Sequence, residues 1–125
     1  MSRQVVRTEN APGAVGPYSQ GIIANGFIFT AGQTGLIPGT KTLPETVAEQ
    51  TRQVLNNIKG ILEAAGTGMD RIVKTTVYLQ DIKDFATMNE VYASFFPGDP
   101  PARTTVEVAA LPLGALVEIE AVALV

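Results

Sequence analysis

The amino-acid sequence predicts an α+β fold in which two helices cover one face of a mixed β-sheet. Three observations predict this class. Short stretches with strand-like alternation occur near both ends of the chain, two amphipathic helical stretches lie between them, and 125 residues suffice for one hydrophobic core but not for two. No repeat, low-complexity tract or linker interrupts residues 1–125, which are therefore expected to form a single domain.

A short strand and an exposed loop are expected at the start of the chain. Residues 3–8 are predicted to form the strand, and the turn-forming composition of residues 9–13 ends it. Residues 15–21 contain two glycines and a proline, which is typical of an irregular loop. We expect this loop to present Tyr18 and Ser19 rather than bury them.

A β-hairpin is predicted around the dipeptide Asn25-Gly26. Apolar runs at residues 22–24 and 27–30 flank this dipeptide, which favours a type I′ turn because both central residues need positive φ. The second strand ends near Gly32. This glycine either lets backbone amides approach a ligand closely or relieves a β-bulge, and the residues leave both uses open.

Two amphipathic helices are predicted, separated by a strand at residues 71–79. Between residues 44 and 65 apolar side chains recur at intervals of three and four, and Gly66 stands where a left-handed cap would end the helix. Asp84 can cap a second helix that runs to about residue 96. Four large side chains of that helix are expected to point inward, namely Phe85, Met88, Tyr92 and Phe95.

The stretch from Pro101 to Glu120 is predicted to form two strands joined as a hairpin around residues 111–114. Thr, Val and Ile residues alternate with charged residues on both sides of this turn. One register keeps the apolar sides together, because a slip by one residue would turn charges into the core. In that register four polar side chains share a face, namely Arg103, Thr105, Glu118 and Glu120. A solvated sheet face is the alternative to a functional site here.

The face of the sheet without helices must meet solvent or a second copy of the chain. Charged residues make up 17% of the sequence and hydrophobic residues 46%. This low share of charge favours a surface covered by another subunit, so we expect an oligomer.

Composition excludes several classes of chemistry. The chain has no His and no Cys, which excludes a Ser-His-Asp triad, a thiolate or imidazole metal site and a cysteine nucleophile. Acid–base chemistry must then rest on Glu, Asp, Tyr or Lys, and we expect neither a metal nor a cofactor. A net charge of −3 without runs of Lys or Arg disfavours nucleic acid and acidic membranes as partners.

The sequence also indicates a soluble protein. The N-terminal residues lack the pattern of a signal peptide, and no apolar run approaches the roughly 18 residues of a membrane helix. We therefore expect no membrane association and a cytoplasmic location.

Four segments carry a resemblance to a known protein family. In chain order they are Ala14–Gly21 (AVGPYSQG), Thr30–Gln33 (TAGQ), Asp84–Asn89 (DFATMN) and Pro101–Arg103 followed by Glu118–Glu120. With these segments the chain resembles the RidA (YjgF/YER057c/UK114) family along nearly its whole length. Thr105 departs from the family pattern, because many members have a cysteine there, and it excludes a thiol-based redox role.

The resemblance implies a chorismate-mutase-like fold, assembled as a homotrimer with clefts between subunits. It also implies an enamine/imine deaminase that hydrolyses 2-iminobutanoate and 2-iminopropanoate to 2-keto acids and ammonia. Such imines are reactive products of pyridoxal-phosphate-dependent dehydratases, so the implied role is protection against metabolite damage. By the same resemblance Arg103 binds the substrate carboxylate and Glu118 positions a water, and further substrate-binding positions are Tyr18, Gly32, Asn89 and Thr105.

This chemistry does not need an imidazole. The planar guanidinium of Arg103 suits a carboxylate, because it donates two parallel charge-assisted hydrogen bonds. Glu118 can take a proton from water or, when protonated, give one to the carbon of an enamine. Tyr18 is a further possible donor, and backbone amides near Gly32 can stabilise a polar intermediate. Glu120 and Glu107 are expected to have structural roles.

Other functions remain open from the sequence. A non-catalytic protein that binds small keto or imino acids in the same cleft would need the same residues. An endoribonuclease or translation inhibitor is a third hypothesis, which the acidic balance and the absence of His disfavour. Purely structural roles are the alternative for Arg103 as an interface ion pair, Tyr18 as a loop plug and Asn89 as a helix hydrogen-bonder.

Overall fold

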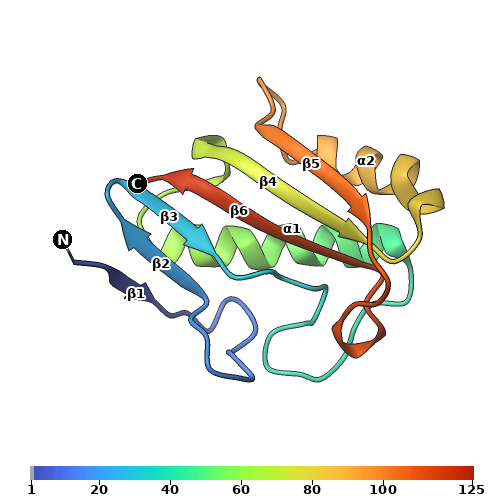
Figure 1. Cartoon of the computed structure of the whole chain (residues 1–125), viewed down its shortest axis with the longest axis horizontal. Coiled ribbons are helices and arrows are strands. Elements are labelled where there is room, and N and C mark those ends of the chain that lie inside the picture. The colour runs from blue at the N-terminus through green and yellow to red at the C-terminus, as the bar shows by residue number, and fades with distance from the viewer. Residues whose placement is uncertain (1) are drawn as a thin grey trace.

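The computed structural model describes residues 2–125 and shows a six-stranded mixed sheet with two helices on one face (Figure 1). The strands are β1 (Gln4–Val6), β2 (Gly21–Ala24), β3 (Phe27–Thr30), β4 (Ile72–Leu79), β5 (Ala102–Glu107) and β6 (Val117–Leu124), and the helices are α1 (Val47–Ala64) and α2 (Phe85–Ala93). Across the sheet the order is β1-β2-β3-β6-β4-β5. The β4–β5 pair is parallel and the other described pairs are antiparallel. The predicted α+β class is confirmed.

Local signals form the predicted turn and the predicted end of α1, whereas the cap at Thr46 was not predicted and the predicted cap Asp84 makes no side-chain hydrogen bond at the start of α2. Asn25 and Gly26 have φ values of 53° and 84°, as a type I′ turn between β2 and β3 requires. Thr46 Oγ1 accepts a hydrogen bond from Glu49 N at 3.1 Å and donates one to Glu49 Oε1 at 2.8 Å, which caps the start of α1. Gly66, with φ of 82°, follows its end.

The hydrophobic core lies between the two helices and the sheet. The fully buried stripe of α1 consists of Val54, Leu55, Ile58, Ile61 and Leu62. Opposite this stripe the sheet buries Ile28, Val77, Leu79, Val117 and Ile119. Each such side chain stabilises the fold by about 1.5–3 kcal/mol, so this layer fixes the face of the sheet that the helices cover.

The predicted hairpin between residues 101 and 120 is wrong, because β4 lies between β5 and β6. On β4, Thr75 has Arg103 of β5 as its parallel partner and Ala121 of β6 as its antiparallel partner. Residues 108–116 cross from the end of β5 to the start of β6 and include a single 3₁₀ turn at Pro112–Gly114. The alternation of side chains identifies a strand correctly, but it does not say which strand lies beside it.

Helix α2 is shorter than predicted, and one of its expected core residues lies outside the core. The helix ends at Ala93, and Phe85 in its first turn is 40% exposed. Met88 and Tyr92 are buried, as expected, at 0% and 5% exposure. Phe85 projects beyond the core because it lies at the margin of the sheet, where its ring contacts Arg103 of β5.

No helix among residues 2–125 is long and apolar enough to span a membrane.

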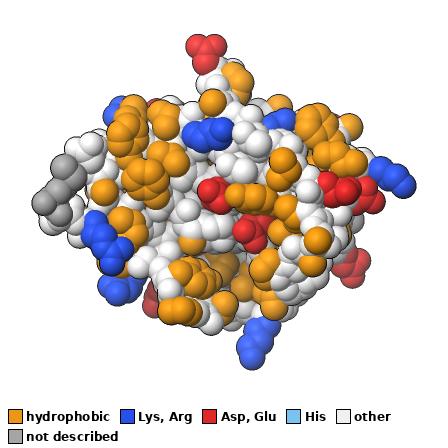
Figure 2. Space-filling view, in the orientation of Figure 1, with side chains coloured by type: hydrophobic (Ala, Val, Ile, Leu, Met, Phe, Trp, Pro, Cys, Tyr) orange, Lys and Arg blue, Asp and Glu red, His pale blue; other side chains and the backbone are white. Residues whose placement is uncertain are grey.

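The face of the sheet turned away from the helices is here called the open face, and the strand register divides it into an apolar half and a more polar half. Ladder partners share a face, so the strand register assigns the side chains. The apolar half comprises Val5, Ile22, Ala24, Phe27, Phe29, Val122 and Leu124. The more polar half comprises Lys74, Thr76, Tyr78, Thr104, Glu118 and Glu120, together with the apolar Ala102 and Val106. Figure 2 shows acidic side chains near the middle of this face, with apolar side chains around them.

Candidate active site

Arg103 lies on the helix side of β5 and stacks on two aromatic rings of α2. Its Cζ atom is 4.8 Å from the ring centroid of Tyr92 and 5.6 Å from that of Phe85. Both distances are typical of cation–π interactions, which orient the guanidinium without using its N–H groups. The half-buried Arg103 is therefore an oriented cation at the margin of the core.

Two buried polar atoms near Arg103 have no hydrogen-bond partner within residues 2–125. They are Oδ1 of Asn89 and Oγ1 of Thr105. Thr105 is two residues along β5 from Arg103, so the two side chains share a face. Asn89 lies four residues after Phe85 and three before Tyr92, so it shares a helix face with both rings. Buried polar atoms are normally hydrogen-bonded, and these two indicate a place for a polar ligand.

These five residues, namely Arg103, Asn89, Thr105, Phe85 and Tyr92, form what we call the arginine cluster. It combines a fixed positive charge with unpaired polar atoms between β5 and α2. Such a set suits a small organic anion.

Glu118 lies on the open face of β6, half-buried against Gly32. A Cβ atom on Gly32 would overlap Oε2 of Glu118 and would lie 3.0 Å from its Cδ. Any other residue at this position would therefore displace the carboxyl group. The sequence left two uses open for Gly32, namely close approach of backbone amides to a ligand and relief of a β-bulge. The contact seen here is neither of them, because the glycine makes room for the side chain of Glu118.

A second carboxyl group, that of Glu120, lies on the same face of β6. Its Oε1 accepts a hydrogen bond of 2.8 Å from the hydroxyl of Tyr78. Tyr78 is itself the ladder partner of Glu118 on β4. Glu120 thus binds a tyrosine and not Arg103, which lies on the other side of the sheet. Glu107 likewise accepts a hydrogen bond from Ile82 N, at 2.8 Å.

The surroundings of these groups shift their pKa values upward. Burial raises the pKa of Glu118 above the ordinary glutamate value, and the negative charge of Glu120 raises it further. The hydrogen bond to Glu120 is the main reason why the pKa of Tyr78 is raised, followed by burial. Burial also raises the pKa of Tyr92, although Thr75 and Arg103 act in the opposite direction. Glu118 therefore keeps a proton at higher pH than an ordinary glutamate.

The predicted shared face of Arg103 and Glu118 is wrong. Arg103 is on the side of Thr75, which is fully buried beneath α2, whereas Glu118 is on the side of Tyr78, on the open face. Thr105 and Glu120, which were predicted to share that face, also lie on opposite faces: Thr105 is on the helix side and Glu120 is on the open face. Because β5 is an edge strand, the long side chain of Arg103 reaches past the core and lies over the rings of α2. A single chain therefore does not bring Arg103 and Glu118 together.

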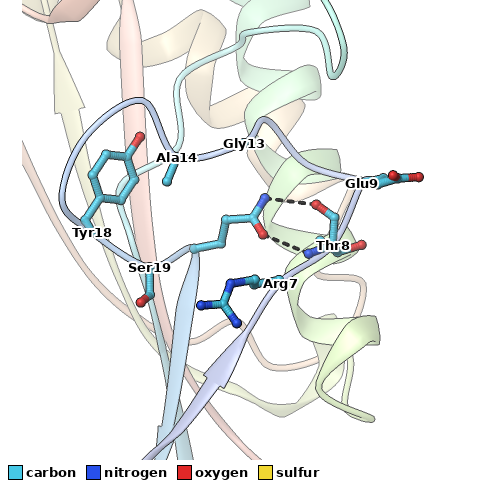
Figure 3. A pocket seen from close by; sticks show the side chains of 8 residues that line it. Arg7, Thr8, Glu9, Gly13, Ala14, Tyr18 and Ser19 are labelled. Carbon is cyan, nitrogen blue, oxygen red and sulfur yellow. Dashed lines mark hydrogen bonds between the residues drawn. The ribbon is translucent and has the colours of Figure 1, made fainter.

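Tyr18 is presented by the loop between β1 and β2, as predicted, and is 49% exposed. It lines a cavity of about 520 Å³, together with Arg7, Thr8, Glu9, Gly13, Ala14, Ser19 and Gln20 (Figure 3). Gln20 holds the loop, because its Oε1 accepts from Thr8 N at 2.8 Å and its Nε2 donates to Pro12 O at 2.8 Å. Gln20 O also accepts from Ala31 N at 2.8 Å, which joins this loop to the segment that carries Gly32.

Sequence reasoning missed the aromatic support of Arg103 and the tyrosine at Glu120. Tyr78 could have been found, because it alternates with Lys74 and Thr76 on the polar side of its strand. Phe85 and Tyr92 carry an apolar helical spacing that indicates only burial. Their contact with Arg103 depends on how α2 packs beside β5, which no local pattern contains.

Comparison with known proteins gives consistent matches. Residues 8–125 match the family model described as Endoribonuclease L-PSP. The chain is 52% identical over 124 residues to reactive intermediate deaminase A, chloroplastic, of Arabidopsis thaliana, covering 98% of this chain and 66% of that relative. It is 49% identical over 123 residues to 2-iminobutanoate/2-iminopropanoate deaminase of Escherichia coli K12, covering 96% of each. The crystal structure of E. coli TdcF with bound serine matches with a TM-score of 0.94 and 43% identity over 98% of both chains.

Proposed function

This chain belongs to the Endoribonuclease L-PSP family, also called the RidA or YjgF family, and from this premise we propose that it is a deaminase of small 2-imino acids. Its substrates are 2-iminobutanoate and 2-iminopropanoate, and its products are the 2-keto acids and ammonia. The names of relatives at 49% and 52% identity support this reaction. A cytoplasmic location remains a prediction, and one of these relatives is chloroplastic.

The observation that carries the proposal is the arginine cluster. The substrate has a carboxylate beside the electrophilic C=N carbon, and Arg103 offers two N–H donors in the plane that a carboxylate needs. The unpaired Asn89 Oδ1 accepts a hydrogen bond from the substrate nitrogen, and the unpaired hydroxyl of Thr105 donates one to an oxygen of the substrate. A structure of TdcF with bound serine supports a site of this size and charge, because serine carries the same α-carboxylate.

The proposed active site lies between two chains of a homotrimer. Glu118 must reach the substrate held by Arg103, and the two side chains leave one sheet from opposite faces. A cyclic assembly solves this, because the Arg103 side of one chain meets the Glu118 side of the next. In the apolar half of the open face, Phe29 is 46% exposed and Leu124 is 36% exposed. Contact between copies would cover this half.

For an enamine, the reaction needs three proton transfers and one water. Protonated Glu118 gives its proton to the β-carbon, and the C=C electron pair forms the new C–H bond while the nitrogen lone pair forms the C=N bond. Water then adds to the imine carbon as the Glu118 carboxylate takes one of its protons. The proton of the new hydroxyl group then moves to the nitrogen, the C–N bond breaks as ammonia leaves, and the oxygen forms the C=O bond of the keto group. Arg103 fixes the imine carbon relative to this carboxyl group throughout.

An imine-trapping assay tests the proposal. A threonine dehydratase generates the imine, and semicarbazide traps it. The protein should accelerate hydrolysis of the imine and so lower the amount of imine that semicarbazide traps. Arg103→Lys keeps the charge but loses the planar fork, so we expect kcat/KM to fall by about 100-fold, because hydrogen bonds to charged groups contribute about 1.5–3 kcal/mol each. Arg52→Ala, which removes an exposed arginine from α1, is the matched control and should leave the rate unchanged.

Two other outcomes separate the alternatives. Binding of 2-ketobutyrate in calorimetry without any acceleration of imine loss would favour a non-catalytic binding protein. Cleavage of RNA that depends on Arg103 would favour the endoribonuclease activity in the family's description. The acidic middle of the open face opposes contact with a polyanion.

A further inference from the structure

We propose that Tyr78 and Glu120 act as a positioning pair, which makes Glu118 the carboxyl group of the open face that carries the proton. The inference rests on the proposed function, because it concerns the residue that exchanges protons with the substrate. Tyr78 and Glu120 touch neither Arg103 nor the arginine cluster, so they would act through Glu118.

The pair is built into the strand register. Glu118 and Glu120 are two residues apart on β6, which places their Cα atoms roughly 6.6 Å apart on one face. Tyr78 stands directly opposite Glu118 on β4, and its hydroxyl reaches diagonally to Glu120 Oε1 at 2.8 Å. The phenol ring therefore runs from one acidic residue to the other.

The hydrogen bond fixes the position of the Glu120 carboxylate relative to Glu118. The hydroxyl of Tyr78 donates to the Glu120 carboxylate and holds it in place, with its negative charge beside Glu118. A fixed negative charge beside Glu118 favours the neutral form of Glu118. Burial against Gly32 acts in the same direction. The two carboxyl groups are thus unequal, although their sequence environments on β6 are alike.

Within one chain the other elements around Glu118 supply no competing charge, and in the proposed trimer the positive charge of the next chain's Arg103 is paired with the substrate carboxylate. The segment after β3 brings Gly32 and Gln33, neither of which titrates. On the open face of β4 the charged residue is Lys74, whose Nζ donates to Thr104 Oγ1 at 3.0 Å and is thereby turned toward β5. Within the described chain, Glu120 is the group whose charge acts on Glu118.

The arrangement would serve the first step of the proposed reaction. Protonation of an enamine carbon needs an acid that still holds its proton near neutral pH, and an ordinary glutamate has lost it there. Once the proton is transferred, the Glu118 carboxylate can take one from water, so one side chain serves both steps. The Tyr78–Glu120 pair would set the pH range in which this exchange works.

Carboxyl titration by NMR of the full-length protein, labelled with ¹³C at glutamate side chains, tests the pair directly. Glu118→Gln identifies the resonance by its loss. Glu120→Gln removes the charge, and Tyr78→Phe removes the hydrogen bond and keeps the ring. Both should lower the titration midpoint of Glu118, by ~0.5 pH units or more for Glu120→Gln and by less for Tyr78→Phe. Thr76→Val, on the same face opposite Glu120, is the matched control and should not move it.

The pH profile of kcat/KM for imine hydrolysis completes the test. If Glu118 exchanges the protons, the limb that reports its ionisation shifts with the NMR midpoint in both variants. An unchanged midpoint in Tyr78→Phe and Glu120→Gln would overturn the inference, whatever the activity. A shifted midpoint with an unmoved pH profile would support the pair while removing Glu118 from the reaction, so the inference and the proposed function fail separately.

Discussion

The side chains of Arg103 and Glu118 leave the sheet in opposite directions within one chain. Arg103 lies over the rings of α2, and Glu118 fits against Gly32 on the open face. A site that uses both residues can therefore form only where two copies meet. Activity measurements on mixed assemblies therefore test how the chains assemble.

Mixed trimers should regain the activity that their parents lack. Arg103→Ala and Glu118→Gln are each expected to abolish imine hydrolysis in the pure protein. When the two variants are co-expressed, each mixed trimer contains one cleft with an intact Arg103 from one chain and an intact Glu118 from the next. Random assembly makes about three quarters of the trimers mixed, each with one of three clefts intact, so about one quarter of wild-type activity should return.

The double variant Arg103→Ala/Glu118→Gln mixed with wild type is the control for subunit exchange. Light scattering should give three chain masses for every sample. No recovery in trimers shown to be mixed would mean that the two residues do not share a cleft, and a monomer would remove the proposed site altogether.

Gly32→Ala should impair catalysis more than stability. The added Cβ would overlap Glu118 Oε2, so the carboxyl group must turn away from its position. A displacement of about 1 Å can cost up to about 100-fold in rate, so we expect kcat/KM to fall by about 10- to 100-fold. Gly98→Ala, whose Cβ would meet nothing within 4 Å, should keep its activity and its stability within about 0.5 kcal/mol. Equal rates for the two variants would contradict the importance of this contact.

Tyr92→Phe should destabilise the protein without removing its activity. The Tyr92 hydroxyl and Thr75 Oγ1 form a buried hydrogen bond of 2.7 Å, and Thr75 has no exposure to solvent. Its loss leaves Thr75 unpaired and should lower the free energy of unfolding by about 1–3 kcal/mol, whereas the ring still supports Arg103. Urea denaturation at one protein concentration measures this loss. The double variant Thr75→Val/Tyr92→Phe should recover part of it, and a further loss in that variant would argue against the hydrogen bond as the cause.

Alkaline pH should weaken the fold through Tyr78. Its pKa in the folded chain is raised above the ordinary value of 10.0, chiefly by the hydrogen bond to Glu120. Its contribution to stability is therefore complete below about pH 10 and is lost as the pH rises through the raised value. Tyrosinate absorbance should show late ionisations of Tyr78 and Tyr92, because both pKa values are raised. The Tyr78 component should be lost in Tyr78→Phe and should move toward pH 10 in Glu120→Gln, and late absorbance that is the same in wild type and both variants would contradict the raised pKa of Tyr78.

Local patterns in the sequence determined the elements of this protein. Asn25-Gly26 specifies a turn because its two φ values are accessible at little cost, and Thr46 with Glu49 caps α1 through groups three residues apart. The same holds for the stripe of α1 and the alternation of β4. The resemblance to the RidA family, carried by four short segments, was confirmed by the family match over residues 8–125.

Tertiary structure alone decided which strands are neighbours and where the proposed site residues point. The alternation at Arg103 and Glu118 identified two strands correctly, yet β4 lies between them, and the parity of each ladder placed the two side chains on opposite faces. Strand order follows from burying one apolar face beneath α1 and α2, which is a property of all the strands together. A local period of two fixes which residues share a side, but the packing of the whole chain chooses the side.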